Sequence, residues 1–139
     1  MNSLAERSQI ASIPVFYIQH ANTSLLIKDT EGWLIHPNIS PQESDMIIHK
    51  TQGNAFLDTT LHKELDKQGV KDLIITGLVT QGCIRATCLG GLELGYRVFL
   101  VEDGHSNFNK DAGSVIRKNQ TKLEQAGVDI ISTKNLAFA

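Results

Sequence analysis

The sequence predicts an α/β fold with a parallel sheet, because strand-like and helix-like patterns alternate along the chain. Five short runs rich in β-branched or aromatic residues stand at wide intervals, at 13–19, 46–50, 73–78, 97–102 and 128–131. Helical patterns lie between them, at 57–68, 83–94 and 111–125. Such alternation favours a parallel sheet with helices on both faces.

The first strand-like run, IPVFYIQ, is followed by a long segment with no regular pattern. Residues 21–43 include Asn22, Pro37 and Pro41 among several turn-forming residues, and this composition favours a surface connection. Loops beside strand ends often cover pockets. We therefore expect residues 21–43 to form a long loop near one edge of the sheet.

Glycines mark the ends of the three helical patterns. Gly69, Gly95 and Gly127 each follow one of them directly, where a left-handed helix cap favours a residue without a β-carbon. Each helix is therefore expected to stop there and return to a strand.

Composition indicates an ordinary globular protein. The chain has 139 residues, 41% of them apolar and 20% charged, with a net charge of -2. This length can bury a core without disulfides or metals, so we expect one domain over residues 1–139. The balanced charge predicts no nucleic-acid partner. The absence of a leader-like or membrane-spanning apolar run predicts no membrane association and a cytoplasmic location.

The two cysteines have different predicted environments. Cys83 and Cys88 form neither a disulfide framework nor a C-x-x-C motif, so both are expected to be reduced thiols. Cys83 lies where strand 73–78 turns into a helix, a position at which helix N–H groups favour a thiolate and can hold an oxyanion. Position alone favours a nucleophile and a small buried core residue equally for Cys83. Cys88 falls on the inward stripe of the helix, and we expect an inert core thiol there.

Lys50 closes the second strand-like run, MIIHK. Carboxyl ends of parallel strands share one edge of a sheet, so this lysine is expected on the same edge as Cys83. An ammonium group there would support a thiolate. A lysine that extends its charge into solvent is the alternative reading.

Four segments together give the chain a resemblance to a known family. They are IPVFYIQH, HKTQGNAFLDTTLHKEL, TGLVTQGCIRAT and LGYRVFLVEDGHSNF. In this combination they resemble the isochorismatase-like cysteine hydrolases over nearly the whole chain. The resemblance implies a Rossmann-like three-layer sandwich with a mostly parallel sheet. It also implies a small-molecule substrate, with hydrolysis of an amide, imide, ester or vinyl ether.

The resemblance also assigns roles to individual residues. Family members use an Asp–Lys–Cys triad, so it implies that Cys83 is the nucleophile and Lys50 the triad lysine. It places a cis peptide at Leu78–Val79 and an oxyanion hole at the backbone N–H groups of Val79 and Cys83. It further implies a homo-oligomer, a dimer or larger.

One family feature has no counterpart in this sequence. Family members begin with an apolar strand that supplies the triad aspartate, whereas residues 1–15 match only the end of the first helix. Asp29, Glu31, Asp45 and Asp103 do not fit the role by position. We expect the strand gap to be closed by pairing of its neighbours, by a partner chain, or by residues upstream of Met1. Loss of a positioned base typically costs about 10²–10⁴-fold in rate, so impaired catalysis is expected.

Several other residues are candidates for the substrate pocket. His20 and His105 follow strand ends, Trp33 lies in the long loop, and Phe56 follows the lysine turn. For each histidine a plain strand-end polar role, and for Phe56 core packing, is the competing reading. No metal is expected, because His20, Asn22, Asp29 and His36 do not reproduce the family's metal cluster. No nucleotide-binding glycine motif is present, and no cofactor is expected.

Three functional readings remain at this stage. The leading one is a hydrolase that acts through Cys83. A non-catalytic binding or assembly relative of the family is the second, favoured by the missing aspartate. A redox-sensing thiol protein is the third, but it requires a resolving cysteine, and Cys88 is poorly placed for that role.

Overall fold

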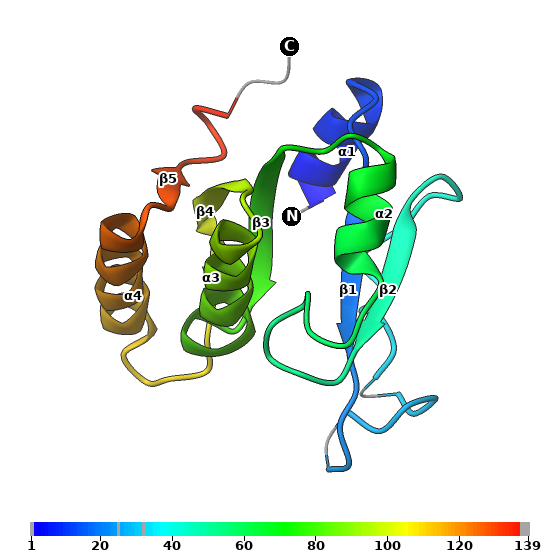
Figure 1. Ribbon diagram of the computed structural model, residues 1–139. Coiled ribbons are helices and arrows are strands. Elements are labelled where there is room, and N and C mark those ends of the chain that lie inside the picture. The colour runs from blue at the N-terminus through cyan, green and yellow to red at the C-terminus, as the bar shows by residue number, and fades with distance from the viewer. Residues whose placement is uncertain (1, 25, 32, 137–139) are drawn as a thin grey trace.

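A computed structural model describes residues 2–24, 26–31 and 33–136, and it confirms the α/β fold. All five predicted strands are present, and Figure 1 shows them with the helices packed alongside. The elements in chain order are α1 (Asn2–Ile10), β1 (Phe16–His20), β2 (Met46–Lys50), α2 (Leu61–Lys67), β3 (Asp72–Leu78), η1 (Thr80–Ile84), α3 (Arg85–Glu93), β4 (Arg97–Ser106), α4 (Ala112–Ala126) and β5 (Asp129–Ile131).

The strands are divided between two parallel sheets. In the first sheet β1 pairs with β2, from Phe16 opposite Met46 to His20 opposite Lys50. In the second sheet the strand order is β3-β4-β5. Figure 1 shows β1 and β2 set apart from β3. Direct pairing of β1 with β3, one of the expected ways to close the gap, does not occur in the described part of the chain.

The core is centred on β4. Its Val98, Leu100 and Val101 are completely buried. Val98 and Leu100 belong to the main hydrophobic cluster together with Leu65 of α2 and Leu123 of α4. Full burial of one such side chain stabilises the fold by about 1.5–3 kcal/mol. The sheet with β4 therefore carries most of the core.

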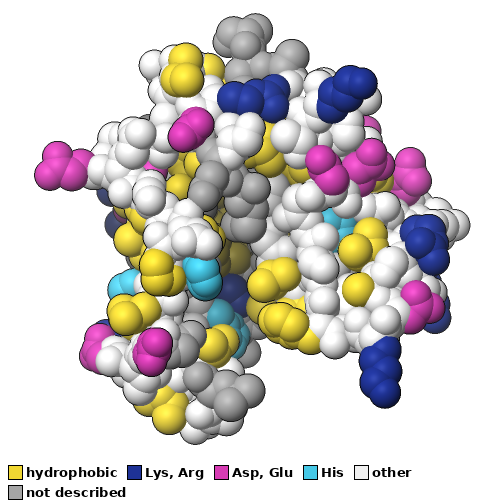
Figure 2. All heavy atoms as spheres, turned by 180° about the vertical axis from the view of Figure 1, so that it is seen from behind, with side chains coloured by type: hydrophobic (Ala, Val, Ile, Leu, Met, Phe, Trp, Pro, Cys, Tyr) yellow, Lys and Arg dark blue, Asp and Glu magenta, His cyan; other side chains and the backbone are white. Residues whose placement is uncertain are grey.

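The opposite side of the sheets is covered less completely. Val101 contributes to a second, smaller cluster with Leu4 of α1 and Leu136. Ile47 of β2 and Ile74 of β3 remain 45% and 39% exposed. Figure 2, which views the molecule from behind, shows hydrophobic side chains at the surface. Helices thus protect one side of the sheets better than the other, whereas the sequence predicted cover on both.

Helix α2 starts later than the predicted residue 57, because side chains hold the preceding residues in turns. The Asn54 side chain accepts a hydrogen bond from the N–H of Phe56 at 2.9 Å. The Thr59 hydroxyl donates to the Ala55 carbonyl at 2.6 Å. Asp58 has a positive φ of 56°. Such local hydrogen bonds compete with helical ones, and the helix begins only at Leu61.

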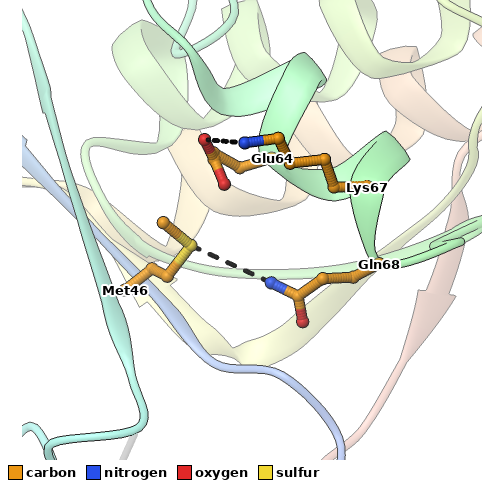
Figure 3. A network of polar contacts seen from close by, with 4 residues as sticks. All are labelled: Met46, Glu64, Lys67 and Gln68. Atoms are coloured by element: carbon orange, nitrogen blue, oxygen red, sulfur yellow. Dashed lines mark hydrogen bonds and ion pairs between the residues drawn. The ribbon is translucent and has the colours of Figure 1, made fainter.

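The end of α2 contacts the start of β2. Figure 3 shows the amide of Gln68 pointing at the sulfur of Met46, with 3.9 Å between nitrogen and sulfur. On the same helix Lys67 pairs with Glu64 at 3.4 Å. These exposed contacts contribute little individually.

The last helix has the predicted ends. Asp111 caps α4 by accepting a hydrogen bond from the N–H of Ser114 at 3.3 Å. Gly127 ends the helix in the left-handed conformation, with φ of 111°. The long connection predicted at 21–43 has no regular element in its described residues. Residues 25 and 32 of that connection lie outside the described part.

No helix within the described residues is long and apolar enough to cross a membrane.

Candidate active site

The backbone between β3 and α3 differs from the predicted simple helix start. The α-helix begins at Arg85, and residues 80–84 form the π-helical turn η1, interrupted by non-helical Gly82. Cys83 therefore lies within this turn, ahead of the first residue of α3. The peptide bond Leu78–Val79 is cis, as the resemblance implied.

The predicted meeting of Lys50 and Cys83 is confirmed by the geometry. Lys50 Nζ lies 3.1 Å from Cys83 Sγ, and the lysine is only 5% exposed. Since β2 and β3 belong to different sheets, this contact joins the two halves of the site. The alternative of a lysine extended into solvent is wrong.

A buried ammonium group needs hydrogen-bond partners, because its desolvation is costly. Lys50 Nζ is 2.8 Å from His20 Nδ1 and 2.9 Å from the Gln52 carbonyl oxygen. The Gly53 carbonyl oxygen lies farther away, at 3.4 Å. Among the described residues no carboxylate forms an ion pair with Lys50. A Cys83 thiolate would therefore be the closest anion to this cation.

The turn after Lys50 contacts α3 through residues that were not among the site residues predicted from the sequence. The N–H of Ala55 donates to the Thr87 hydroxyl at 3.0 Å. Asn54 packs so closely on Gly90 that a β-carbon there would lie 2.5 Å from its side-chain amide. Gly90, a glycine inside a helical pattern, is the sequence feature that could have predicted this close approach.

His105 lies behind the Cys83 turn. It is 6% exposed, and its Nδ1 is 2.9 Å from the hydroxyl of Thr80, which is completely buried. Its Nε2 lies 3.0 Å from the amide nitrogen of Gln120. An amide nitrogen only donates, so Nε2 is the acceptor and Nδ1 carries the proton given to Thr80. Burial lowers the pKa of His105. His105 therefore supports the turn instead of lining a pocket.

Two other pocket candidates, Trp33 and Phe56, pack against other aromatic rings. Trp33 stacks edge-on against His49, with ring centroids 5.4 Å apart. Because side chains alternate along a strand, His49 points to the sheet face opposite Lys50. Phe56 stacks on Tyr96 at 5.7 Å and packs against the main core cluster. Of the four pocket candidates, His20 is the one with a hydrogen-bond contact to the Lys50–Cys83 pair among the described residues, with its Nδ1 2.8 Å from Lys50 Nζ.

The two cysteines differ as predicted. Cys88 is completely buried in the main cluster, and burial raises its pKa to about 12. Cys83 is partly exposed. Only Cys83 thus combines access with a neighbouring cation. Among the residues described, no group of three or more His, Cys, Asp or Glu side chains is arranged to hold a metal ion.

The fold and the site define a class of protein, one with a cysteine beside a buried lysine at the end of parallel strands. The family model for the isochorismatase domain matches residues 1–135, so the chain belongs to the isochorismatase-like hydrolase family.

Individual relatives show how far the similarity extends. Streptothricin hydrolase of Streptomyces noursei is 32% identical over 108 residues, which are 76% of this chain and 39% of that protein. Nicotinamidase 3 of Arabidopsis thaliana is 29% identical over 117 residues, 73% of this chain and 59% of that protein. The chain thus spans less than two thirds of the length of either relative.

Solved structures share the arrangement of the whole chain. An isochorismatase from Pseudomonas putida matches with a TM-score of 0.89 at 23% identity. The match covers 98% of this chain and 75% of that one. At this identity the match supports the fold alone.

Proposed function

We propose that this protein hydrolyses a C–N bond in a small amide or imide, with Cys83 as the nucleophile. The observation that carries the proposal is the 3.1 Å contact between Lys50 Nζ and Cys83 Sγ at a partly exposed thiol. An adjacent ammonium stabilises a thiolate, which is the nucleophilic form of cysteine. The names of relatives such as nicotinamidase 3 favour amides over the esters and vinyl ethers that the family resemblance also allows.

The reaction proceeds in two stages through a thioester. The Cys83 thiolate attacks the carbonyl carbon, and the resulting oxyanion is received by the backbone N–H groups of Val79 and Cys83. When the C–N bond breaks, the leaving nitrogen takes a proton from Lys50. Water then attacks the thioester and returns a proton to Lys50, so that the acid leaves and the thiolate reforms. No resident cofactor or metal takes part in these steps.

Turnover by these residues alone is expected to be slow. Lys50 contacts no carboxylate in the described part of the chain, and a missing positioned base costs about 10²–10⁴-fold. The same observation favours a second candidate function, binding of a small molecule without turnover. A redox-sensing function is less well supported, because Cys88 is completely buried and cannot easily act as a resolving thiol.

Ammonia release from a panel of small primary amides and cyclic imides tests the proposal. The unmodified chain should give slow but measurable release, and Cys83→Ser should abolish it. Cys88→Ser, five residues later in α3 and completely buried in the core, is the matched control and should retain activity if folded. Ammonia release that persists in Cys83→Ser would refute the assignment of Cys83 as the nucleophile. Substrate binding by calorimetry without any release would favour the second function. Size-exclusion chromatography with light scattering would test the expected homo-oligomer.

A further inference from the structure

The contacts of Lys50 determine which atom of His20 carries a proton. A lysine ammonium has three protons and accepts no hydrogen bond. Its three shortest contacts are to His20 Nδ1, the Gln52 carbonyl and Cys83 Sγ, at 2.8, 2.9 and 3.1 Å. His20 Nδ1 must therefore be an acceptor, and the neutral ring keeps its proton on Nε2.

The backbone fixes the position of this acceptor. His20 and Lys50 are register partners on β1 and β2, so both side chains leave the sheet on the same face. The next N–H along, that of Ala21, donates to the Lys50 carbonyl at 2.9 Å and extends the pairing beyond β1. His20 and the Gln52 carbonyl thus hold two protons of the ammonium group, and the third is directed at Cys83.

We propose that neutral His20 is a positioning residue, which holds the Lys50 ammonium against the Cys83 sulfur by accepting a hydrogen bond at Nδ1. This inference rests on the proposed function, since it takes Cys83 as the nucleophile. It adds a residue from β1 to a site otherwise built by β2 and η1.

The charge state of His20 makes the arrangement sensitive to acid. Burial, and then the neighbouring Lys50 charge, lowers the pKa of His20 below its ordinary 6.5. Among the described residues, the titratable side chains in this hydrogen-bonded group are Lys50 on β2, which contacts His20, and Cys83 on η1, which contacts Lys50. Protonation of His20 removes the acceptor and places a second cation 2.8 Å from the ammonium nitrogen. The Lys50–Cys83 contact should therefore weaken at a pH below 6.5.

Alkylation of Cys83 by iodoacetamide, followed by peptide mass spectrometry, tests this role without any substrate. His20→Asn retains an acceptor near the position of Nδ1 but cannot be protonated, whereas His20→Leu removes the acceptor. At pH near 7.5 we expect His20→Leu to slow alkylation about tenfold, the effect of one hydrogen bond to a charged group, and His20→Asn to stay close to the unmodified rate. Between about pH 6.5 and 5 the unmodified rate should fall more steeply than that of His20→Asn.

The outcomes separate this role from a merely structural one. Equal rates in His20→Leu and the unmodified protein would overturn the proposal, as would an equal loss in both variants. Circular dichroism checks that each variant is folded. If His20→Leu does not fold, the pH profile of His20→Asn decides, and a profile identical to that of the unmodified protein counts against the proposal. Because labelling needs no turnover, failure of the amide panel remains distinguishable from failure of the His20 role.

Discussion

The two sheets contribute unequally to the protein, one most of the core and the other most of the charge at the site. The sheet β3-β4-β5 contains completely buried Leu100 and leads directly into the turn that carries Cys83. The sheet β1-β2 has one strongly buried aliphatic residue, Ile48, at 5% exposure, yet it holds Lys50 and His20. The turn that holds Cys83, the proposed nucleophile, is thus fixed by packing, whereas its cationic neighbour is fixed by hydrogen bonds.

The largest expected effect contrasts the cores of the two sheets. Leu100→Ala should lower the free energy of unfolding by about 2–5 kcal/mol, because it leaves a cavity in a completely buried position. Ile47→Ala removes a side chain that is 45% exposed on β2 and should cost about 1 kcal/mol or less. Urea unfolding of both variants measures the difference. Equal losses would show that β1-β2 is packed as tightly as the larger sheet.

Much of this division was predictable, and the part that was not depends on long-range packing. Apolar runs identified all five strands, the helical pattern at 111–125 located α4, and Gly127 marked its end. The shared edge of Lys50 and Cys83 followed from the rule that parallel strands end on one side. The sequence did not predict that Trp33 packs against His49, on the sheet face opposite Lys50. The path of a loop over a sheet leaves no periodic pattern in the sequence.

The role of His105 also could not be predicted from the sequence, because it depends on long-range packing. Its position after a strand suggested an open pocket, yet β4 continues through residue 106 and buries the ring against Thr80 and Gln120. The partner on α4 lies 15 residues away in sequence. Only the packing of that helix on β4 reveals the contact, and no local motif encodes it.

The next prediction removes the charge that β1-β2 supplies. Lys50→Met retains most of the side-chain length but lacks the ammonium group 3.1 Å from Cys83 Sγ. We expect alkylation of Cys83 to slow by about 10- to 100-fold, equivalent to roughly 1.4–2.7 kcal/mol in activation free energy. Peptide mass spectrometry after timed labelling gives the rate. Lys67→Met, at an exposed position of α2, is the control and should label like the unmodified protein.

A Lys50→Met rate equal to that of the control would mean that β1-β2 adds nothing to the reactivity of Cys83. The contact would then be a consequence of packing alone, and the helix-proximal turn would account for any reactivity. A labelling rate that rises in Lys50→Met would indicate that the substitution opens the site, which a parallel measurement on Cys88 would reveal.

The smallest expected effect compares the two histidines as pH sensors of stability. The pKa values of His105 and His20 both lie below the ordinary 6.5, for each chiefly because of burial. As the pH falls below 6.5, the unfolded chain therefore binds more protons than the folded one, and the free energy of unfolding decreases. This contribution is complete above the unfolded pKa of 6.5 and is lost as the pH falls toward each folded pKa.

Urea unfolding at several pH values between 5 and 7.5 measures this slope without interference from Asp103. The hydrogen bond from the Thr133 N–H, together with that from the Thr133 hydroxyl, holds the pKa of Asp103 below 3.8, outside this window. His105→Gln should flatten the slope more than His20→Asn, because His105 is only 6% exposed whereas His20 is partly exposed. If His20→Asn flattens the slope more than His105→Gln, the pKa of His20 is lowered more than that of His105. That result would contradict the contrast in packing between the two sheets.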